Sequence, residues 1–466
     1  MTTNWRNKQV VIIGAARQGL ALARYLARHG ARVTVNDRRP ASELVEEMAL
    51  LAKFDLTWAV GEHDPQMIAQ AQALFVSGGV PLENPLVLAA RQQGIPVSND
   101  TQVFMQAAPC KSIGITGSAG KTTTTTLVGK IAQIGSSGKY GRVWIGGNIG
   151  DPLINYVDEM QASDLAILEI SSFQSELMTT SPDIAAILNI TSNHLDRHKT
   201  MENYIAAKAN VLAGQSESGI AILGRDDPGS WALLPRVRGR LLSFGFSPLP
   251  AGMDGAYVQN GQFFIREGQQ IIPLPVAEVI ELRGEHNRLN VLAACLIAHA
   301  AGFSPESMRE AVRGFRGVAH RLEFVRTWRG AQWYNDSIAT APERAIAAIR
   351  SFDGPLIVML GGRDKDLPWD DLAKLVHQRV DHVILFGEAA EKIEAALGAR
   401  VPGNRPFSQA KAANLKDAVL AASRVAQPGF VVLLSPGGTS YDEFKDFAER
   451  GERFKKWVLE FSEALR

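Results

Sequence analysis

The stretch Lys111-Ser-Ile-Gly-Ile-Thr-Gly-Ser-Ala-Gly-Lys-Thr-Thr123 decides the fold of the middle of this 466-residue chain. Its first half predicts a buried strand, and its second half predicts a Gly-rich turn that opens a helix. Such a turn is typical of a phosphate-binding loop, because backbone N–H groups and the helix N-terminus favour phosphate oxygens there. Lys121 would neutralise the phosphates, and Thr122 would offer a hydroxyl to Mg²⁺. The strict pattern fails because Ile115, and not glycine, stands five residues before Gly120, so a plain glycine turn is the alternative.

Two apolar runs further along, residues 164–170 and 184–190, predict parallel strands of the same sheet, buried on both faces. Glu169 stands near the end of the first run, and His194 comes just past the second. Because ligands gather outside the carboxyl ends of such strands, we expect both side chains beside the phosphate loop as Mg²⁺ ligands. His194 and His198 also have the i, i+4 spacing of a zinc pair, but no further Cys or His lies nearby in the sequence.

The first 105 residues alternate short β-branched runs with helical patterns, which predicts a βαβ domain. Its first turn, Gly14-Ala-Ala-Arg-Gln-Gly19, is similar to a dinucleotide fingerprint, and Asp37 lies at the end of the next strand. Ala16 replaces the middle glycine, however, and its Cβ would crowd a pyrophosphate against the turn. We therefore expect a nucleotide or phosphate held in a different way, with an NAD-dependent oxidoreductase as an alternative function.

The remaining segments predict more α/β structure. Residues 219–282 have short spacing and many Gly and Pro residues, which favours antiparallel strands or an embellishment whose role the sequence does not reveal. Beyond residue 317, apolar runs predict strands at 355–362, 382–387 and 430–436, and a helix at 441–465 closes the chain. Four polar, Gly-bearing segments beside these strands point to a site: 319–323, 334–340, 361–365 and 435–445. We predict an α/β protein of three domains: Rossmann-like at 1–110, a central P-loop ATP-binding domain with a parallel sheet at 111–317, and Rossmann-like at 318–466.

The composition excludes several classes of protein. Lys and Arg number 49 and Asp and Glu 48, so a net charge of +1 supplies no global field for nucleic acid or an anionic membrane. Only two cysteines occur, Cys110 and Cys295, which excludes a disulfide framework and fits a reducing compartment. No segment approaches the ~20 apolar residues that span a bilayer, and the N-terminus has no signal-peptide core. We expect a cytoplasmic protein, a monomer, without nucleic-acid partners or membrane insertion.

Taken together, these motifs resemble the Mur ligases of peptidoglycan synthesis, in particular the branch that adds glutamate. The resemblance covers all three predicted domains, and the order and spacing of its motifs are specific. The matching segments are Gly117-Ser-Ala-Gly-Lys-Thr-Thr123, Gly146-Gly-Asn-Ile-Gly150, Leu168-Glu-Ile-Ser-Ser-Phe-Gln174, Asn193-His-Leu-Asp-Arg197, Ala206-Ala-Lys208, Gly284-Glu-His-Asn287, His320-Arg-Leu-Glu323, Asn335-Asp-Ser337 and Leu434-Ser-Pro436.

The resemblance implies ATP-dependent amide formation in cell-wall precursor synthesis. In this family the N-terminal domain binds the UDP part of the substrate, the central domain binds ATP, and the C-terminal domain brings the amino acid. The carboxylate of UDP-N-acetylmuramoyl-L-alanine attacks the γ-phosphate to give an acyl phosphate, and the amine of glutamate then displaces phosphate. Because two anions must meet, Lys121 and two Mg²⁺ ions have to offset their repulsion.

The resemblance also implies the roles of single residues around the phosphates. Thr122 and Glu169 would hold the ATP-linked Mg²⁺, and His194 would help to hold the second ion. Lys208 matches the family lysine that CO₂ converts to a carbamate, which makes it an oxygen ligand of Mg²⁺. Asn148 would contact the substrate near its reacting carboxylate. The base for the incoming amine stays unassigned, because a His194 that coordinates Mg²⁺ cannot accept a proton on the same lone pair.

The other implied contacts fall into three sets. ATP would be bound by the phosphate loop and three later residues, namely Gly117, Ser118, Ala119, Gly120, Lys121, Thr122, Thr123, Asn287, Arg321 and Asp336. The UDP-linked substrate would be contacted at its uridine diphosphate part by Arg17, Gln18, Asp37, Arg38 and Gly79, and near its reacting carboxylate by Asn148. The carboxylates of glutamate would be held by Thr340, Lys365, Ser440 and Phe447.

Two positions depart from the family pattern. Ala119 stands where the phosphate loop usually has Asn, so one amide side chain is missing. Ile338 stands where the D-glutamate-adding branch typically has Lys, which removes an attraction for an anion near the reaction centre. We favour D-glutamate as the substrate and keep the L-glutamate-adding ligase of the same family as the alternative. A non-catalytic binding protein that retains the ligase fold is a further alternative, which loss of activity in Lys121→Ala would exclude.

Overall fold

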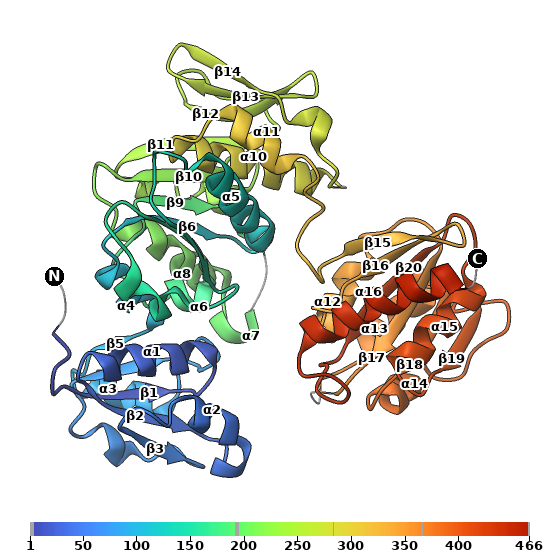
Figure 1. The fold of residues 1–466 in the computed structure, drawn as a ribbon, viewed down its shortest axis with the longest axis horizontal. Coiled ribbons are helices and arrows are strands. Elements are labelled where there is room, and N and C mark those ends of the chain that lie inside the picture. The colour runs from blue at the N-terminus through green and yellow to red at the C-terminus, as the bar shows by residue number, and fades with distance from the viewer. Residues whose placement is uncertain (1–3, 192–194, 283, 365–366, 465–466) are drawn as a thin grey trace. The chain divides into compact units, whose positions relative to one another are not determined.

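A computed structural model describes residues 4–191, 195–282, 284–364 and 367–464. The chain divides into two compact units, Met1–Phe315 and Arg316–Arg466, each made of sheets covered by helices (Figure 1). The predicted α/β class with parallel sheets is confirmed. The first unit contains two sheets that share an apolar core, with members as distant as Leu26, Phe104 and Trp144, so the contacts do not separate the two predicted domains within it. The predicted limits at 110 and 317 stay predictions.

The N-terminal sheet has five parallel strands in the order β3-β2-β1-β4-β5. These are β1 (Gln9–Ile13), β2 (Arg32–Asp37), β3 (Leu56–Val60), β4 (Ala73–Val76) and β5 (Val97–Ser98). The helices between them are α1 (Arg17–Arg28), α2 (Val45–Leu50) and α3 (Pro85–Gln92), and α4 (Asp100–Ala107) follows β5. The strand order reverses between β1 and β4, which is where doubly wound sheets bind their ligands.

The central sheet has nine strands in the order β14-β13-β12-β11-β10-β9-β6-β8-β7. Its parallel part is β6 (Lys111–Thr116), β7 (Val143–Gly147), β8 (Leu165–Glu169), β9 (Ile184–Ile187), β10 (Ile220–Gly224), β11 (Arg240–Gly245) and β12 (Gly255–Gln259), and β13 (Gln262–Glu267) and β14 (Gln270–Leu274) are antiparallel. The helices are α5 (Lys121–Gly135), α6 (Ser172–Ser175), α7 (Leu195–His198), α8 (Met201–Ala213), α9 (Pro228–Trp231), α10 (Glu285–Ala300) and α11 (Pro305–Val312).

Residues 219–282 are therefore only partly what the sequence predicted. β10 and β11 continue the parallel sheet, and the antiparallel pairing is confined to β12–β14. The reason for the hairpin is local: Asn260 and Gly261, which join β12 to β13, both have positive φ, as a two-residue type I′ turn requires.

The second unit has one sheet in the order β15-β16-β20-β17-β18-β19, in which only β15 is antiparallel. Its strands are β15 (Glu323–Trp328), β16 (Ala331–Asn335), β17 (Leu356–Gly361), β18 (His382–Phe386), β19 (Ser408–Lys411) and β20 (Val431–Gly437). Its helices are α12 (Pro342–Ile349), α13 (Asp370–Arg379), α14 (Ala390–Leu397), α15 (Leu415–Val425) and α16 (Phe447–Ala464). The three predicted strands are present as β17, β18 and β20, whereas the predicted closing helix begins only at Phe447.

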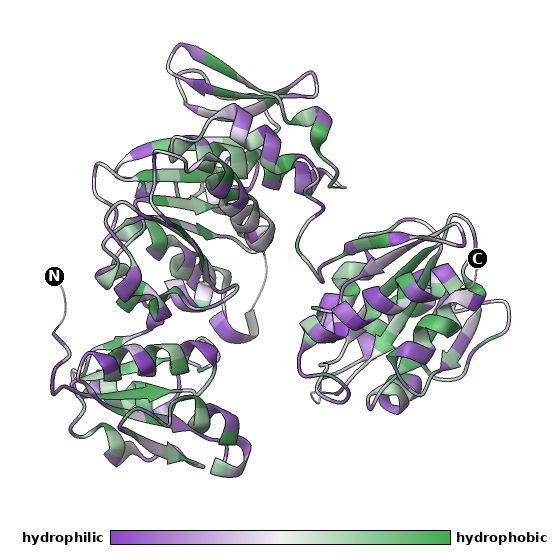
Figure 2. Ribbon diagram, in the orientation of Figure 1, coloured by the Kyte–Doolittle hydropathy of each residue, from purple (hydrophilic) through white to green (hydrophobic). Residues whose placement is uncertain are grey.

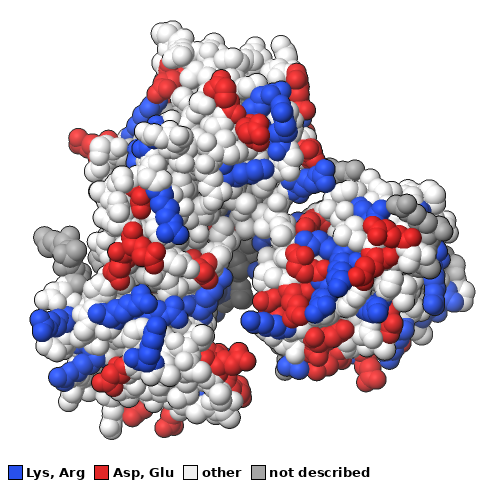
Figure 3. Space-filling model, in the orientation of Figure 1, with Lys and Arg blue, Asp and Glu red and all other residues white. Residues whose placement is uncertain are grey.

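The distribution of side chains follows the layers. In Figure 2 the strands are largely hydrophobic, whereas the helices carry hydrophilic and hydrophobic residues in turn. On the face shown in Figure 3, basic and acidic side chains are interspersed over each unit, in line with the net charge of +1. Among the described residues, no helix combines the length and apolar character that crossing a bilayer demands.

Candidate functional site

The phosphate loop lies between β6 and α5, as predicted. Gly120 caps α5 with a φ of +81°, a left-handed conformation that glycine adopts readily. A Cβ at this position would also overlap the side-chain oxygen of Asn290 on α10. The Asn290 amide donates to Asn287 Oδ1 over 3.3 Å. The structure thus brings predicted Asn287 to the loop through Asn290, which the sequence analysis missed.

A second asparagine, Asn189, lies two residues past β9 and fixes the loop. Asn189 Oδ1 accepts a hydrogen bond from the Ala119 N–H over 2.8 Å, and its Nδ2 donates to the Ala119 carbonyl over 3.1 Å. Ser118 Oγ lies 2.9 Å from the hydroxyl of Tyr204, and the two share a hydrogen bond. The missing amide at position 119 is therefore not needed to shape the loop, because Asn189 holds the backbone there. Asn189 lies inside the run 184–190 that predicted a strand, and the observed strand β9 ends two residues before it, at Ile187.

Two lysines converge on one carbonyl of this loop. Lys121 Nζ donates to the Gly117 carbonyl over 2.8 Å, and Lys208 Nζ donates to the same oxygen over 3.0 Å. Lys208, on α8, is 1% exposed. Burial, together with repulsion from Lys121, lowers the pKa of Lys208 well below its usual value, although Glu169 opposes the shift. A neutral amine at position 208 is the form that can react with CO₂.

Glu169, the last residue of β8, is 2% exposed. Its Oε1 accepts a hydrogen bond from Asn148 Nδ2 over 2.7 Å, so the structure joins two predicted site residues. Its Oε2 is buried and finds no hydrogen-bond partner among the described residues. An unpartnered buried carboxylate oxygen is costly and fits a position for a cation.

The other predicted ligands of this region also suit Mg²⁺. Thr122, in the first turn of α5, is 8% exposed and offers a hydroxyl, and a carbamate on Lys208 would add oxygen donors. Predicted His194 lies outside the described residues. In the described part of the chain, no group of three or more His, Cys, Asp or Glu side chains is placed to hold a metal. His198 instead packs on Phe173, with its Nε2 3.0 Å from Ser172 Oγ.

A cavity of about 610 Å³ lies at the carboxyl edge of the N-terminal sheet. Three of the residues predicted to contact uridine diphosphate line it, namely Asp37, Arg38 and Gly79. Arg17 and Gln18 begin α1, and Arg17 Nη2 donates to the Asn148 carbonyl over 3.1 Å, which links α1 to the central site.

Arg197, on α7, ties the cavity wall to the central sheet. Its guanidinium donates to the carbonyls of Gly79 and Val80 and lies 4.8 Å from the ring centroid of Phe173. Phe173 is four residues past Glu169. The sequence analysis quoted Arg197 within a family motif but gave it no role, because its hydrogen-bond partners Gly79 and Val80 are more than a hundred residues away in the chain.

The second unit contains the other predicted contacts, of which Lys365 lies outside the described residues. Asp336 is buried, and its carboxylate accepts hydrogen bonds from the Leu322 N–H over 3.1 Å and from Ser435 Oγ over 2.9 Å. Burial raises the pKa of Asp336 to about 7, against those bonds and the charge of Arg321. Arg321 stands between two residues with positive φ, His320 and Leu322, a strained arrangement of the kind found at functional sites.

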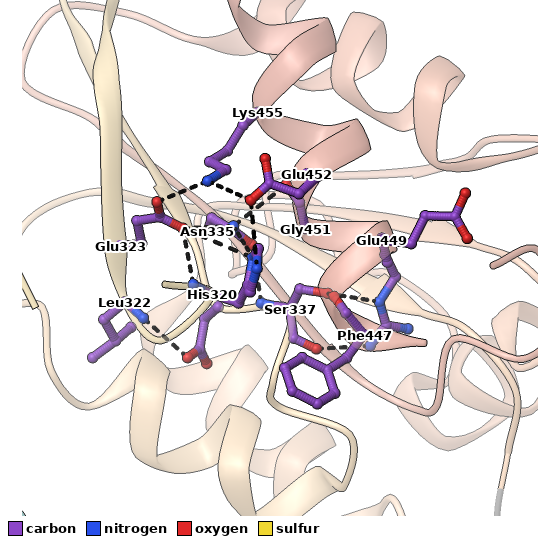
Figure 4. A network of polar contacts seen from close by, with 12 residues as sticks. His320, Leu322, Glu323, Asn335, Ser337, Phe447, Glu449, Gly451, Glu452 and Lys455 are labelled. Atoms are coloured by element: carbon purple, nitrogen blue, oxygen red, sulfur yellow. Dashed lines mark hydrogen bonds and ion pairs between the residues drawn. The ribbon is translucent and has the colours of Figure 1, made fainter. Parts of the chain in front are cut away.

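A polar network supports this segment (Figure 4). The amide of Asn335 donates to His320 Nδ1 and to Glu323 Oε2, both over 3.0 Å. Lys455, on α16, donates to Glu323 Oε1 over 3.0 Å and pairs with Glu452 at 2.8 Å. These contacts fix the strained turn that carries Arg321.

Buried Arg450, which the sequence analysis missed, gathers the segments of the predicted glutamate contacts. Its guanidinium donates to the carbonyls of Ser337 and Thr439, over 2.9 and 2.8 Å. Ser337 Oγ in turn donates to the Phe447 carbonyl over 2.7 Å. The segments that bear Thr340, Ser440 and Phe447 are thereby held around one side chain.

Comparisons with known proteins agree with this arrangement. Three family models match successive stretches of the chain: the N-terminal domain of MurD-like Mur ligases at residues 8–99, the Mur ligase middle domain at 115–298, and the glutamate ligase domain of Mur ligases at 320–438.

Individual relatives match nearly the whole chain. The UDP-N-acetylmuramoylalanine–D-glutamate ligase of Symbiobacterium thermophilum is 39% identical over 97% of this chain and 98% of its own. That of Koribacter versatilis is 40% identical over 98% of each chain. The fold also matches the MurF ligase of Thermotoga maritima, solved in complex with ADP, at 16% identity and a TM-score of 0.54 over all of both chains. The MurC ligase of the same organism gives 17% identity and a TM-score of 0.53 over 97% of this chain and 99% of that one.

Proposed function

Because the chain belongs to the Mur ligase family, we propose that it is an ATP-dependent ligase that joins glutamate to UDP-N-acetylmuramoyl-L-alanine in peptidoglycan precursor synthesis. The two relatives near 40% identity are D-glutamate ligases, which supports the D isomer as the substrate. The reaction passes through an acyl phosphate and releases ADP and phosphate.

One observation carries the proposal: two lysines, a phosphate loop and an unpartnered buried carboxylate oxygen meet at one edge of the central sheet. Lys121 and Lys208 share the Gly117 carbonyl, and Glu169 Oε2 lies on the neighbouring strand β8. This combination suits a triphosphate and a cation and has no evident use in a dinucleotide-binding oxidoreductase.

The first step is phosphoryl transfer to the carboxylate of the substrate. Lys121 offsets the repulsion between that carboxylate and the γ-phosphate, and the loop N–H groups orient the phosphates. Asn148, held by Glu169, positions the substrate near its reacting end. Thr122 and Glu169 would hold the ATP-linked Mg²⁺, His194 would help to hold a second, and a carbamate on Lys208 would add an oxygen ligand; these ions would supply positive charge at the transferring group.

The second step is attack by the amine of glutamate on the acyl phosphate. Thr340, Lys365, Ser440 and Phe447 hold the carboxylates of glutamate, and Arg450 keeps three of their segments together. Asn287, Arg321 and Asp336 contact ATP. We also assign the enzyme to the cytoplasm and to a monomer; its two cysteines, both buried and unpaired, fit a reducing compartment.

Phosphate release tests the proposal. The purified protein with Mg²⁺ and ATP should release phosphate only when UDP-N-acetylmuramoyl-L-alanine and glutamate are both present. Release that ignores either substrate would contradict the catalytic assignment.

The two glutamate isomers, assayed side by side, decide the stereochemistry. We expect turnover with D-glutamate and little with L-glutamate. Ile338, in place of the usual Lys, is the feature that favours the opposite result. A preference for the L isomer would leave the ligase assignment in place and correct the substrate.

A further inference from the structure

His63, just past β3, lines the N-terminal cavity, and the structure fixes which of its ring nitrogens carries the proton. Asn36, fully buried on β2, donates from Nδ2 to the carbonyls of Ala59 and Glu62 over 2.7 and 2.8 Å. Its Oδ1 therefore faces His63 and lies 2.5 Å from Nδ1. A carboxamide oxygen only accepts, so Nδ1 carries a hydrogen, and the neutral ring keeps an acceptor lone pair on Nε2.

The place of His63 in the sheet selects the part of a nucleotide that it would meet. In this fold phosphates lie at the turn after the first strand, where α1 begins. β3 lies two strands away from β1, beyond β2. Because neighbouring strands are about 4.8 Å apart, His63 lies roughly 10 Å along the edge from the phosphate turn. That separation places His63 at the nucleoside end of a bound nucleotide.

The acidic residue that usually contacts the ribose in this fold is already occupied. Asp37 Oδ1 accepts hydrogen bonds from the N–H and Nε of Arg39, over 3.0 and 3.1 Å. Its Oδ2 accepts from the Ala15 N–H over 2.9 Å and from Arg39 Nη2 over 3.1 Å. A carboxylate offers about four acceptor positions, and all four are used within the chain. The cavity needs another acceptor for the nucleoside.

We propose that His63 is a specificity residue whose Nε2 accepts a hydrogen bond from the nucleoside part of the substrate. The donor is the N3–H of uracil or the 2′-hydroxyl of the ribose, since both are donors to a neutral acceptor. Asn36 acts through His63, because it holds the ring in the Nδ1–H form. This inference rests on the proposed function, which supplies uridine diphosphate as the occupant of the cavity.

Two matched substitutions separate the two ring nitrogens. His63→Asn keeps an N–H near the position of Nδ1 and loses the distal acceptor, whereas His63→Gln keeps a polar group near the position of Nε2. By isothermal titration calorimetry on the full chain, His63→Asn should weaken UDP binding about tenfold, the worth of one neutral hydrogen bond. His63→Gln should bind UDP within about threefold of the wild type. His377→Asn, at an exposed histidine of the second unit, is the control and should change nothing.

The nucleotide used identifies the donor. With CDP, whose ring N3 carries no hydrogen, the effect of His63→Asn should vanish if uracil N3–H is the donor. With 2′-deoxy-UDP it should vanish if the ribose hydroxyl is the donor. An effect that persists with both nucleotides, or equal UDP binding by His63→Asn and the wild type, overturns the inference and leaves the ligase assignment standing. If the wild type binds no UDP, the inference and the proposed substrate both fall.

Discussion

Replacing Asp336 by asparagine should make the protein more stable above pH 7 and, at the same time, impair its use of ATP. The carboxyl is 4% exposed, and burial raises its pKa from 3.8 to about 7 despite the hydrogen bonds from Ser435 and Leu322. An asparagine stays neutral at every pH. Its side-chain oxygen can still accept from the Leu322 N–H, and its NH₂ can donate to Ser435 Oγ.

The size of the effect follows from the shift in pKa. At 1.36 kcal/mol per unit, a pKa raised from 3.8 to about 7 corresponds to about 4 kcal/mol. Between these two pH values the folded chain keeps a proton that the unfolded chain has lost. The contribution of Asp336 to the free energy of unfolding is therefore fully present below pH 4 and lost as the pH rises to 7. Asp336→Asn should gain up to about 4 kcal/mol over the wild type at pH 8 and little at pH 4.

Calorimetry on the full chain measures this gain. In a unit of this size 1 kcal/mol moves the melting temperature by about 2–4 °C, so the transition of the second unit should rise by roughly 10 °C at pH 8 and much less at pH 5. Asp353→Asn, at an exposed carboxylate of the same unit, is the control and should shift neither value. A difference between wild type and Asp336→Asn that is the same at both pH values would refute the reasoning.

The same variant should lose function. If Asp336 contacts ATP as proposed, its replacement should raise the KM for ATP by about tenfold, the worth of a hydrogen bond to a charged group. A more stable and less active protein is the expected sign of a carboxyl retained for its function.

Three further substitutions test the central site. Lys121→Ala should lower the rate of phosphate release about 10³-fold, because it removes the positive charge that offsets the charge of the phosphates. Lys130→Ala, on the same helix, should leave this rate unchanged. If Lys121→Ala releases phosphate as fast as Lys130→Ala, the proposed role of Lys121 is excluded. Lys208→Ala should be inactive and should recover part of its activity in added formate or acetate, which can replace a carbamate, and Lys121→Ala should show no such rescue. Gly120→Ala should destabilise the loop by about 1–3 kcal/mol, because position 120 has a positive φ and the added Cβ would clash with Asn290. Combining it with Asn290→Gly should remove the clash and leave only the cost of the positive φ. If Gly120→Ala has the stability of the wild type, the loop geometry is contradicted.

Most of the strands and the phosphate loop could be predicted because their signals are local. An apolar run closed by Gly or Ser marks the end of a parallel strand, and ligands gather at that edge. Glu169 was found in this way, whereas Asn148 was implied only by the family resemblance; the structure joins the two by a hydrogen bond. The edge strands β15 and β19 were not foreseen, since half-buried edge strands lack a continuous apolar run.

The residues that the sequence analysis missed have partners far away in the chain. Asn189 bonds a residue seventy positions earlier, and Arg450 bonds one more than a hundred positions earlier. No local pattern marks such contacts. Asp37 has a partner close by in the chain. Its position at the end of β2 predicts a ligand contact, and in the structure Arg39, two residues further along, donates hydrogen bonds to both of its carboxylate oxygens.

The two lysines of the central site also explain why a carbamate suits this position. Two ammonium groups on the Gly117 carbonyl would repel each other, and burial together with this repulsion lowers the pKa of Lys208, which favours its neutral form. With Lys121 positive and Glu169 negative, a neutral Lys208 leaves the group without net charge. A carbamate on Lys208 would change the net charge of this group to −1. One bound divalent cation would then change it to +1, next to a triphosphate. In the proposed reaction, a carbamate on Lys208 would thus help to attract the metal, and the metal would help to attract ATP.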